Sequence, residues 1–215
     1  MFETIKQALR EQFQQAEVVS PYANITHAAH ETTASEPKRI EHVMVDIETL
    51  GKGNNAAILS IGMVKFNPFT EDIYDSFYVP VDPESCQALG LKIDASTVMW
   101  WLHSDRDAAR AAMMQETRVD LPSALYGLVD WFGEDKPVWG NGATFDNVIL
   151  SNAFKACNID QPWQFWNDKC YRTLKGQAKN IKLVREGVYH NALDDAISQA
   201  KHMQDIVDYL GLNTL

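Results

Sequence analysis

Apolar side chains recur at every second position of residues 42–48 (HVMVDIE), which predicts a strand with one buried face. Residues 57–67 and 72–81 have a similar strand-like content and are joined by a turn at NPFTED. Because consecutive strands joined by short turns usually pair with each other, these segments predict a meander of three antiparallel strands.

After residue 95 the apolar positions are mostly three and four residues apart, which predicts helices. The predicted helices span residues 96–104, 105–116, 121–134, 144–157 and about 190–210. Pro122 is expected in a first helical turn, and Gly211 is expected to cap the last helix. Residues 136–142, an apolar run ended by glycines, predict one more strand. Strands followed by helices that alternate with a strand indicate an α/β layered sheet.

The first 41 residues have a different pattern. Residues 1–17 place apolar side chains at helical spacing, and residues 18–41 are rich in Ser, Thr, Ala and Pro. We therefore expect a helix-and-linker extension over residues 1–41 and one folded domain over residues 42–215. The extension's helix could cap the domain, form a dimer contact or bind a partner, and the sequence does not decide among these roles.

The composition is that of an ordinary globular protein, with 46% hydrophobic and 22% charged residues among 215. No apolar run approaches the roughly 20 residues that a membrane span needs, and acids and glutamines occupy the N-terminus where a signal peptide would be apolar. The three cysteines form no CxxC pair, which argues against a disulfide framework or structural zinc. We expect a cytoplasmic protein without membrane association.

A net charge of −10 argues against a nucleic-acid partner, because phosphate binding depends on Lys and Arg. However, residues 169–185 (KCYRTLKGQAKNIKLVR) contain six basic residues and no acid. This segment is either one solvated face of a helix and loop, or a local phosphate-binding rim on an acidic body.

Two acids share one face of the first strand. Asp46 and Glu48 are two residues apart, and positions i and i+2 of a strand point to the same side. Two carboxylates this close repel each other, and burying either without a partner costs free energy. No Lys or Arg follows them before Lys52.

Two further acidic features occur later in the chain. Asp146 begins a helix after the glycine-bounded strand, and His190 precedes Asp195 by five residues in HNALDDA. Each feature alone is ordinary: a strand that emerges into solvent, a carboxylate at a helix N-terminus, a helix start with acids in its first turn. Together they supply four carboxylates and an imidazole, and two divalent cations a few ångströms apart need about four acids. The sequence therefore predicts a two-metal site.

The motif order D-x-E, F-D-N and H-x-A-L-x-D resembles the histidine-bearing (DEDDh) branch of the DEDD superfamily of 3′-5′ exonucleases. That branch includes the proofreading subunit of the bacterial replicative polymerase, ribonuclease T and oligoribonuclease-like enzymes. The segments GKGNNAAILSIGMVKFNP, TVMWWLHS, VWGNGATFDNVIL and PWQFWNDKCYRTLK are similar to a smaller phage and bacterial group of stand-alone members. The resemblance covers roughly residues 42–208.

The resemblance implies a ribonuclease H-like three-layer fold, in which helices flank a mixed sheet that includes the three antiparallel strands. It implies that two Mg²⁺ or Mn²⁺ ions are held by Asp46, Glu48, Asp146 and Asp195. His190 would be the general base. Asp194 also follows His190, but the family spacing selects Asp195, and we expect Asp194 to cap the helix or face solvent.

Six residues are predicted to contact the substrate: Thr49, Leu50, Asn141, Phe145, Arg172 and Lys175. The resemblance implies that Thr49 and Leu50 contact the terminal nucleotide through backbone and hydroxyl groups and that Leu50 acts as an apolar wedge. Leu50 could equally be part of the core. Phe145 could stack on a base or pack under its helix, and Asn147 could contact sugar or phosphate. Trp100 and Trp101 are adjacent on a predicted helix, so we expect one in the core and one near the cleft.

The implied activity is two-metal hydrolysis of phosphodiester bonds at single-stranded 3′ ends, releasing nucleoside 5′-monophosphates. DNA is slightly favoured by the resemblance to phage members, and trimming of RNA 3′ ends is the alternative. A non-catalytic nucleic-acid-binding module would be expected to lack one of the five site residues, and a Ca²⁺ protein would need a D-x-D-x-D-G loop. The resemblance also leaves open a phage-encoded origin, with action in the bacterial host cytoplasm, and a homodimer through the apolar face of residues 2–13.

Overall fold

A computed structural model describes residues 39–114 and 117–215 of the chain. Ile40–Leu215 forms one compact unit. The predicted helix over residues 1–17, the linker up to residue 38 and the apolar face of residues 2–13 lie outside the described residues.

Five strands form one mixed sheet in the order β3-β2-β1-β4-β5. The strands are β1 (His42–Thr49), β2 (Ile58–Phe66), β3 (Ile73–Pro80), β4 (Val138–Gly140) and β5 (Asp168–Cys170). β1, β2 and β3 pair antiparallel, which confirms the predicted meander, whereas β4 runs parallel to β1 and β5 parallel to β4. β5 has no counterpart among the predicted elements, because a strand of three residues is too short to show a periodicity.

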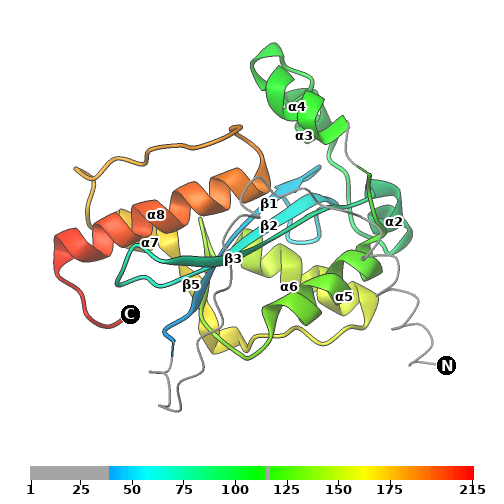
Figure 1. Ribbon diagram of the computed structural model, residues 1–215. Helices are drawn as coiled ribbons and strands as arrows, with labels where there is room; N and C mark the ends of the chain where they lie inside the picture. Colours follow the sequence, from blue (N-terminus) through cyan, green and yellow to red (C-terminus); the bar gives the residue numbers. More distant parts are fainter. Residues whose placement is uncertain (1–38, 115–116) are drawn as a thin grey trace, which may run out of the picture. The chain divides into compact units, whose positions relative to one another are not determined.

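Helices cover both faces of this sheet (Figure 1), with α8 on one side and α5 and α6 on the other. The helices are α2 (Pro83–Ala88), α3 (Ala95–Trp101), α4 (Asp107–Met114), α5 (Leu121–Phe132), α6 (Asp146–Cys157), α7 (Tyr171–Lys175) and α8 (Ala192–Leu210), with 3-10 turns η1 (Ser104–Arg106) and η2 (Phe165–Asn167). The four helices predicted over residues 96–104, 121–134, 144–157 and 190–210 are confirmed. The first part of the segment predicted over residues 105–116 is η1, and its helix begins at Asp107. α2 and α7 were not predicted, since each is less than two turns long.

The side chains of β1 divide between the two layers of helices. Val43 and Val45 belong to the hydrophobic core that includes α5 and α6, whereas Met44 belongs to the core that includes α8. Because side chains alternate along a strand, Asp46 and Glu48 lie on the α8 side with Met44. The polar end of β1 therefore faces the start of α8.

Two glycines allow the helices to approach the sheet closely. A Cβ atom at Gly62 of β2 would lie 2.3 Å from the carbonyl carbon of Ala192, the first residue of α8. A Cβ atom at Gly140 of β4 would lie 2.4 Å from Oδ1 of Asn147 and 3.1 Å from Oδ2 of Asp146. Larger residues at these two positions would move the beginnings of α8 and α6 away from β1.

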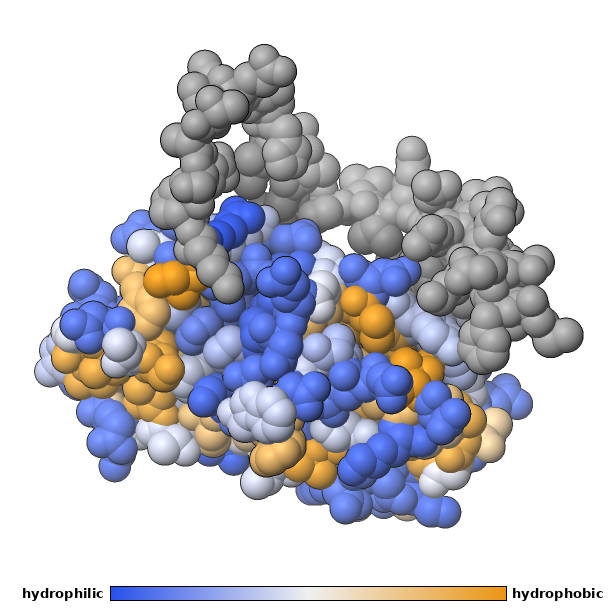
Figure 2. Space-filling view, turned by 90° about the horizontal axis from the view of Figure 1, so that it is seen from below, coloured by the Kyte–Doolittle hydropathy of each residue, from blue (hydrophilic) through white to orange (hydrophobic). Residues whose placement is uncertain are grey.

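The ends of α8 are defined by local signals. The Asn191 side chain caps its first turn by accepting hydrogen bonds from the backbone N–H groups of Leu193 and Asp194, at 3.1 and 3.2 Å. Gly211 ends the helix with a φ of 63°, as predicted. None of the described helices combines the length and the apolar content that a membrane span requires. Figure 2 shows one face of the molecule, on which hydrophobic residues form separate patches among hydrophilic ones.

Candidate active site

A cavity of about 210 Å³ lies where the end of β1 meets the starts of α6 and α8. All five residues predicted as metal ligands and base line it: Asp46, Glu48, Asp146, His190 and Asp195. They come from positions up to 149 residues apart in the chain, 46 and 195, and the fold brings them together.

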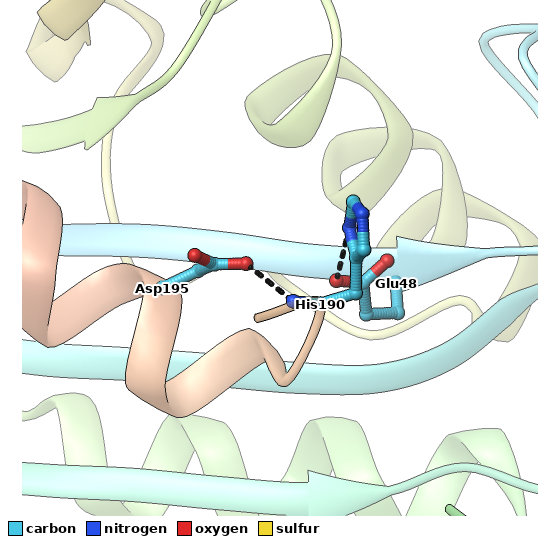
Figure 3. Close-up of side chains that lie close together, drawn as sticks. All are labelled: Glu48, His190 and Asp195. Atoms are coloured by element: carbon cyan, nitrogen blue, oxygen red, sulfur yellow. Dashed lines mark hydrogen bonds and ion pairs between the residues drawn. The ribbon is translucent and has the colours of Figure 1, made fainter. Parts of the chain in front are cut away.

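Three of these residues form the closest group (Figure 3). Ligand atoms of Glu48, His190 and Asp195 all lie within 4.8 Å of one another. Nδ1 of His190 is 3.9 Å from Oε1 of Glu48. The backbone N–H of His190 donates to Oδ2 of Asp195 at 3.0 Å, so the helix that carries Asp195 also positions the histidine backbone.

The backbone at His190 is unusual for a residue with a side chain. Its φ of 67° lies in the left-handed region, which costs free energy at residues other than glycine. Asp194 stabilises the preceding loop by accepting a hydrogen bond from the backbone N–H of Val188 at 2.7 Å. The expectation that Asp194 caps the helix or faces solvent is thus wrong: Asn191 is the cap, and Asp194 is half-buried against the loop.

Aromatic rings enclose the imidazole of His190. The ring of Tyr189 stacks on it with centroids 3.7 Å apart, and Trp100 contacts it edge to face at 5.0 Å. Two guanidinium groups lie outside these rings, Arg106 over Trp100 and Arg185 over Tyr189, each 3.8 Å from the ring centroid. Burial, followed by the positive charges of Arg106 and Arg185, lowers the pKa of His190, which favours the neutral imidazole.

The adjacent tryptophans divide as predicted between the core and the cleft. Trp101 is buried against Leu59 and Ala109, and its Nε1–H donates to the carbonyl oxygen of Thr49 at 3.0 Å. Trp100 is half-buried beside His190. The helix α3 is therefore held against the end of β1 by Trp101 and contacts His190 at the cavity through Trp100.

The carboxylates at the end of β1 carry an electrostatic cost. Burial, together with the charges of the neighbouring acids, raises the pKa of Asp46 and of Glu48 well above their ordinary values. Gln199 lowers this cost for Asp46, because its amide donates to Oδ1 of Asp46 at 2.8 Å. The oxygen of the Gln199 amide is buried and has no hydrogen-bond partner among the described residues.

For Asp146 on α6 and Asp195 on α8, hydrogen bonds and nearby arginines offset part of the cost of burying the charge. Burial raises the pKa of Asp146 to about 7, although backbone N–H groups, among them that of Ile47, and the charge of Arg172 favour the carboxylate. Burial also raises the pKa of Asp195, against the hydrogen bond from His190 and an ion pair with Arg185. Both arginines come from the basic segment over residues 169–185, far from Asp46 in the chain, so the spacing around Asp46 does not show that they offset the acids.

Four carboxylates and an imidazole are a donor set suited to hard divalent cations such as Mg²⁺ and Mn²⁺. The raised pKa values of the acids point the same way, since nearby positive charge is what would return these groups to the ionised form. The unpartnered oxygen of Gln199 adds a further oxygen beside Asp46. The residues that line the cavity fit a divalent metal site.

Three of the predicted substrate contacts also line the cavity, namely Asn141, Phe145 and Arg172. Arg172 is exposed and donates to the carbonyl oxygen of Asn141 at 2.5 Å. Phe145 is half-buried and packs against the core that includes α5 and α6, as one of its two alternatives expected, and it also lines the cavity.

Other predicted contacts lie elsewhere. The hydroxyl of Thr49 is buried and donates to the carbonyl oxygen of Gly51 at 2.7 Å, so a contact with a nucleotide would have to replace this bond. Leu50 is half-buried against the core. Lys175 lines a second cavity. Asn147 cannot contact sugar or phosphate as predicted, because it is fully buried and donates to Val138 and Asp168.

Four residues that line the cavity were not predicted as site residues: the apolar Ile47 of β1, and Arg185, Tyr189 and Gln199. A signal was available for the glutamine, since Gln199 follows Asp195 by four residues on α8 and must share its face. The positions of Arg185 and Tyr189 depend on how the loop before α8 folds back, and this loop has no periodic pattern.

The chain resembles known proteins in its sequence. Residues 41–207 match the family described as the 3′-5′ exoribonuclease Rv2179c-like domain. Over 169 residues the chain is 22% identical to the exodeoxyribonuclease of Enterobacteria phage T4, a match that covers 66% of this chain and 73% of the phage protein.

Solved structures resemble the fold. The nuclease domain of 3′hExo, a DEDDh family member bound to rAMP, has a TM-score of 0.53 and 17% identity, with 79% of this chain and 92% of that chain covered. Escherichia coli exonuclease I in complex with a dT13 oligonucleotide has a TM-score of 0.55 and 14% identity, with 80% of this chain and 43% of that chain covered. The mixed five-stranded sheet with flanking helices is the ribonuclease H-like fold of these nucleases, as the sequence resemblance implied.

Proposed function

The chain belongs to the 3′-5′ exoribonuclease Rv2179c-like domain family, within the DEDDh 3′-5′ exonucleases, and we propose that it removes nucleoside 5′-monophosphates from single-stranded 3′ ends. The observation that carries the proposal is the convergence of four carboxylates and one histidine on a single cavity of about 210 Å³. These five residues match the DEDDh motif in type and in chain order.

We propose that Asp46, Glu48, Asp146 and Asp195 hold two Mg²⁺ or Mn²⁺ ions. Divalent cations bound there would supply positive charge that polarises the terminal phosphodiester and stabilises the negative charge that builds up during hydrolysis. Gln199 would orient Asp46 through the hydrogen bond between them.

His190 would be the general base. Its lowered pKa keeps the imidazole neutral near pH 7, so it can accept a proton from the water that attacks the terminal phosphorus. The bond from phosphorus to the 3′ oxygen of the preceding nucleotide breaks, and the terminal nucleotide leaves as a 5′-monophosphate. The rings of Tyr189 and Trp100 would hold the imidazole in place for this transfer.

Substrate contacts would come from the rim of the cavity. Phe145 could stack on the terminal base, an interaction that tolerates any sequence, and Arg172 could neutralise a phosphate. DNA is our first choice of substrate, supported by the similarity to the phage T4 exodeoxyribonuclease. RNA is the second candidate, supported by the description of the family. The choice depends on whether a side chain contacts a 2′-hydroxyl.

The test is digestion of single strands of DNA and RNA of one sequence, labelled at the 3′ or at the 5′ end, with Mg²⁺, Mn²⁺ or EDTA. We expect 3′-labelled mononucleotide to appear first, only with a divalent cation, and with one sugar preferred. Digestion in EDTA, or release from the 5′ end first, would contradict the proposal.

The role of His190 is tested by the variant His190→Ala, which should lower turnover by about 10²- to 10⁴-fold, the usual contribution of a general base. The matched control is His103→Ala, because His103 is exposed and does not line the cavity. Turnover of His190→Ala equal to that of the control would exclude the base assignment.

A further inference from the structure

A second cavity, of about 450 Å³, adjoins the candidate active site. Arg172 lines both cavities, so the two meet at this side chain. The second cavity, which we call the basic cavity, is lined by the cations Arg172, Lys175, Lys179 and Lys182 and by the apolar residues Ile181 and Leu183.

The lysines of the basic cavity have no acidic partner among the described residues, whereas the charge of Arg172 also stabilises the Asp146 carboxylate of the active site. No acidic residue lines the cavity, and within the described part of the chain none of its four cations lies within 4.0 Å of a carboxylate oxygen. Lys182 instead donates to the carbonyl oxygen of Lys179 at 3.0 Å. Among the described residues these four cations form no ion pair, and together they create a local positive potential that attracts anions on a chain with net charge −10.

The geometry also distinguishes this group from one solvated face of a helix and loop. Arg172 and Lys175 are one turn apart on α7, whereas Lys179 and Lys182 belong to the irregular segment that follows it. A solvated face of a helix and loop would leave its cations spread over open surface, whereas these four cations line one cavity of about 450 Å³. Ile181 and Leu183 are half-buried between them and offer apolar surface to a sugar or base.

We propose that the basic cavity binds the phosphodiester backbone of the substrate strand upstream of its 3′-terminal nucleotide, a role that rests on the proposed exonuclease function. Arg172 would contact the phosphate nearest the active site. Lys175, Lys179 and Lys182 would contact phosphates further toward the 5′ end. Strands long enough to reach the basic cavity would therefore bind more tightly than a dinucleotide does.

The test uses the double variant Lys179→Gln with Lys182→Gln in the full chain. The charge-matched control is Lys92→Gln with Lys155→Gln, two exposed lysines that line neither cavity. Binding is measured in EDTA by fluorescence anisotropy of a labelled 20-nucleotide strand, either DNA or RNA, at several salt concentrations. Hydrolysis with Mg²⁺ or Mn²⁺ gives KM and kcat for the same strand and for a dinucleotide.

We expect the Lys179/Lys182 variant to bind the strand about tenfold more weakly, and its salt slope to fall by about 1.4, since each phosphate contact in a single strand contributes about 0.7. The ratio of the KM for the 20-nucleotide strand to the KM for the dinucleotide should rise by about tenfold. The pair Lys179→Arg with Lys182→Arg should restore binding, which excludes misfolding as the cause.

Equal loss of binding in the Lys92/Lys155 control, or no loss in the Lys179/Lys182 variant, would overturn the proposal. So would an equal rise in KM for the dinucleotide. If the wild-type chain hydrolyses no strand at all, the exonuclease function fails, whereas the binding comparison in EDTA still decides whether the basic cavity binds nucleic acid.

Discussion

At the scale of single residues, burial is the largest influence on the pKa of titratable groups near both ends of β1. It raises the pKa of the four acids of the candidate active site, and it lowers the pKa of His42 at the opposite end of β1. His42 is 8% exposed, and its Nδ1 accepts a hydrogen bond from Nε1 of Trp139 at 3.0 Å. That bond requires the neutral imidazole with its proton on Nε2.

The stability of the protein should therefore depend on pH through His42. Burial, followed by the charge of Lys169, lowers its pKa from 6.5 to about 4. Below pH 6.5 the unfolded chain binds a proton that the folded protein does not, so stability is lost as pH falls toward 4. The loss should reach about 3 kcal/mol between pH 7.5 and pH 4.

The variant His42→Asn isolates this effect, because the Asn oxygen can accept the hydrogen bond from Trp139 without titrating. The measurement is the free energy of unfolding by urea at several pH values, taken as the difference between wild type and variant so that the carboxylates cancel. A difference that stays constant from pH 7.5 to pH 4 would show that His42 does not titrate in this way.

At the scale of elements, the site depends on how closely α8 approaches β2. Gly62 is opposite Asp46 in the β1–β2 pair and lies directly beneath Ala192, at the start of α8. The same helix carries Asp195 and Gln199. The distance from Asp46 to these residues is thus determined by the absence of a side chain at position 62.

The variant Gly62→Ala should lose both stability and exonuclease activity. Its Cβ would lie 2.3 Å from backbone atoms of Ala192 and Leu193, so the helix must move. Overpacking of this kind costs about 3 kcal/mol, measured as the free energy of unfolding. The control is Gly53→Ala, where the nearest atom to the new Cβ is Oδ1 of Asn55 at 3.4 Å, and we expect a change within about 0.5 kcal/mol. A Gly62→Ala protein as stable and active as this control would disprove the close-approach argument.

At the scale of the whole molecule, the fold gathers mutually repelling charges from β1, α6 and α8 in one buried place. This arrangement costs stability in the metal-free protein, and bound cations would offset it. Selection for stability alone would not favour a sequence that buries these acids together.

The variant Glu48→Gln should raise the melting temperature without metal and abolish the further rise with Mn²⁺. Removal of one buried charge relieves repulsion worth roughly 2 kcal/mol, or about 6 °C for a chain of this size. In the wild type, by contrast, binding of a cation to the folded state alone raises the melting temperature with concentration.

The measurement is a thermal unfolding curve in EDTA and at increasing Mn²⁺ concentrations, with Glu71→Gln as the control at an exposed acid. Equal responses of the two variants to Mn²⁺ would remove Glu48 from the proposed metal site.

The sequence by itself determined the features that depend on local spacing. The alternation in β1 placed Asp46 and Glu48 on one face, the motif order indicated Asp146, His190 and Asp195, and Gly211 marked the end of α8. Each of these signals acts over a few residues, because side-chain direction in strands and helix caps is set by the local backbone.

Only the tertiary structure decided which distant groups meet in the cavity. The loop before α8 brings Arg185 to Asp195 and stacks Tyr189 on His190. The absence of a side chain at Gly62 determines how closely α8 approaches the sheet. The helix α7 places Arg172 where it lines both cavities. The packing of α6 against the sheet buries Asn147 completely. These contacts depend on how irregular loops fold back and on how closely the helices approach the sheet. The spacing of hydrophobic residues along the chain carries no information about either.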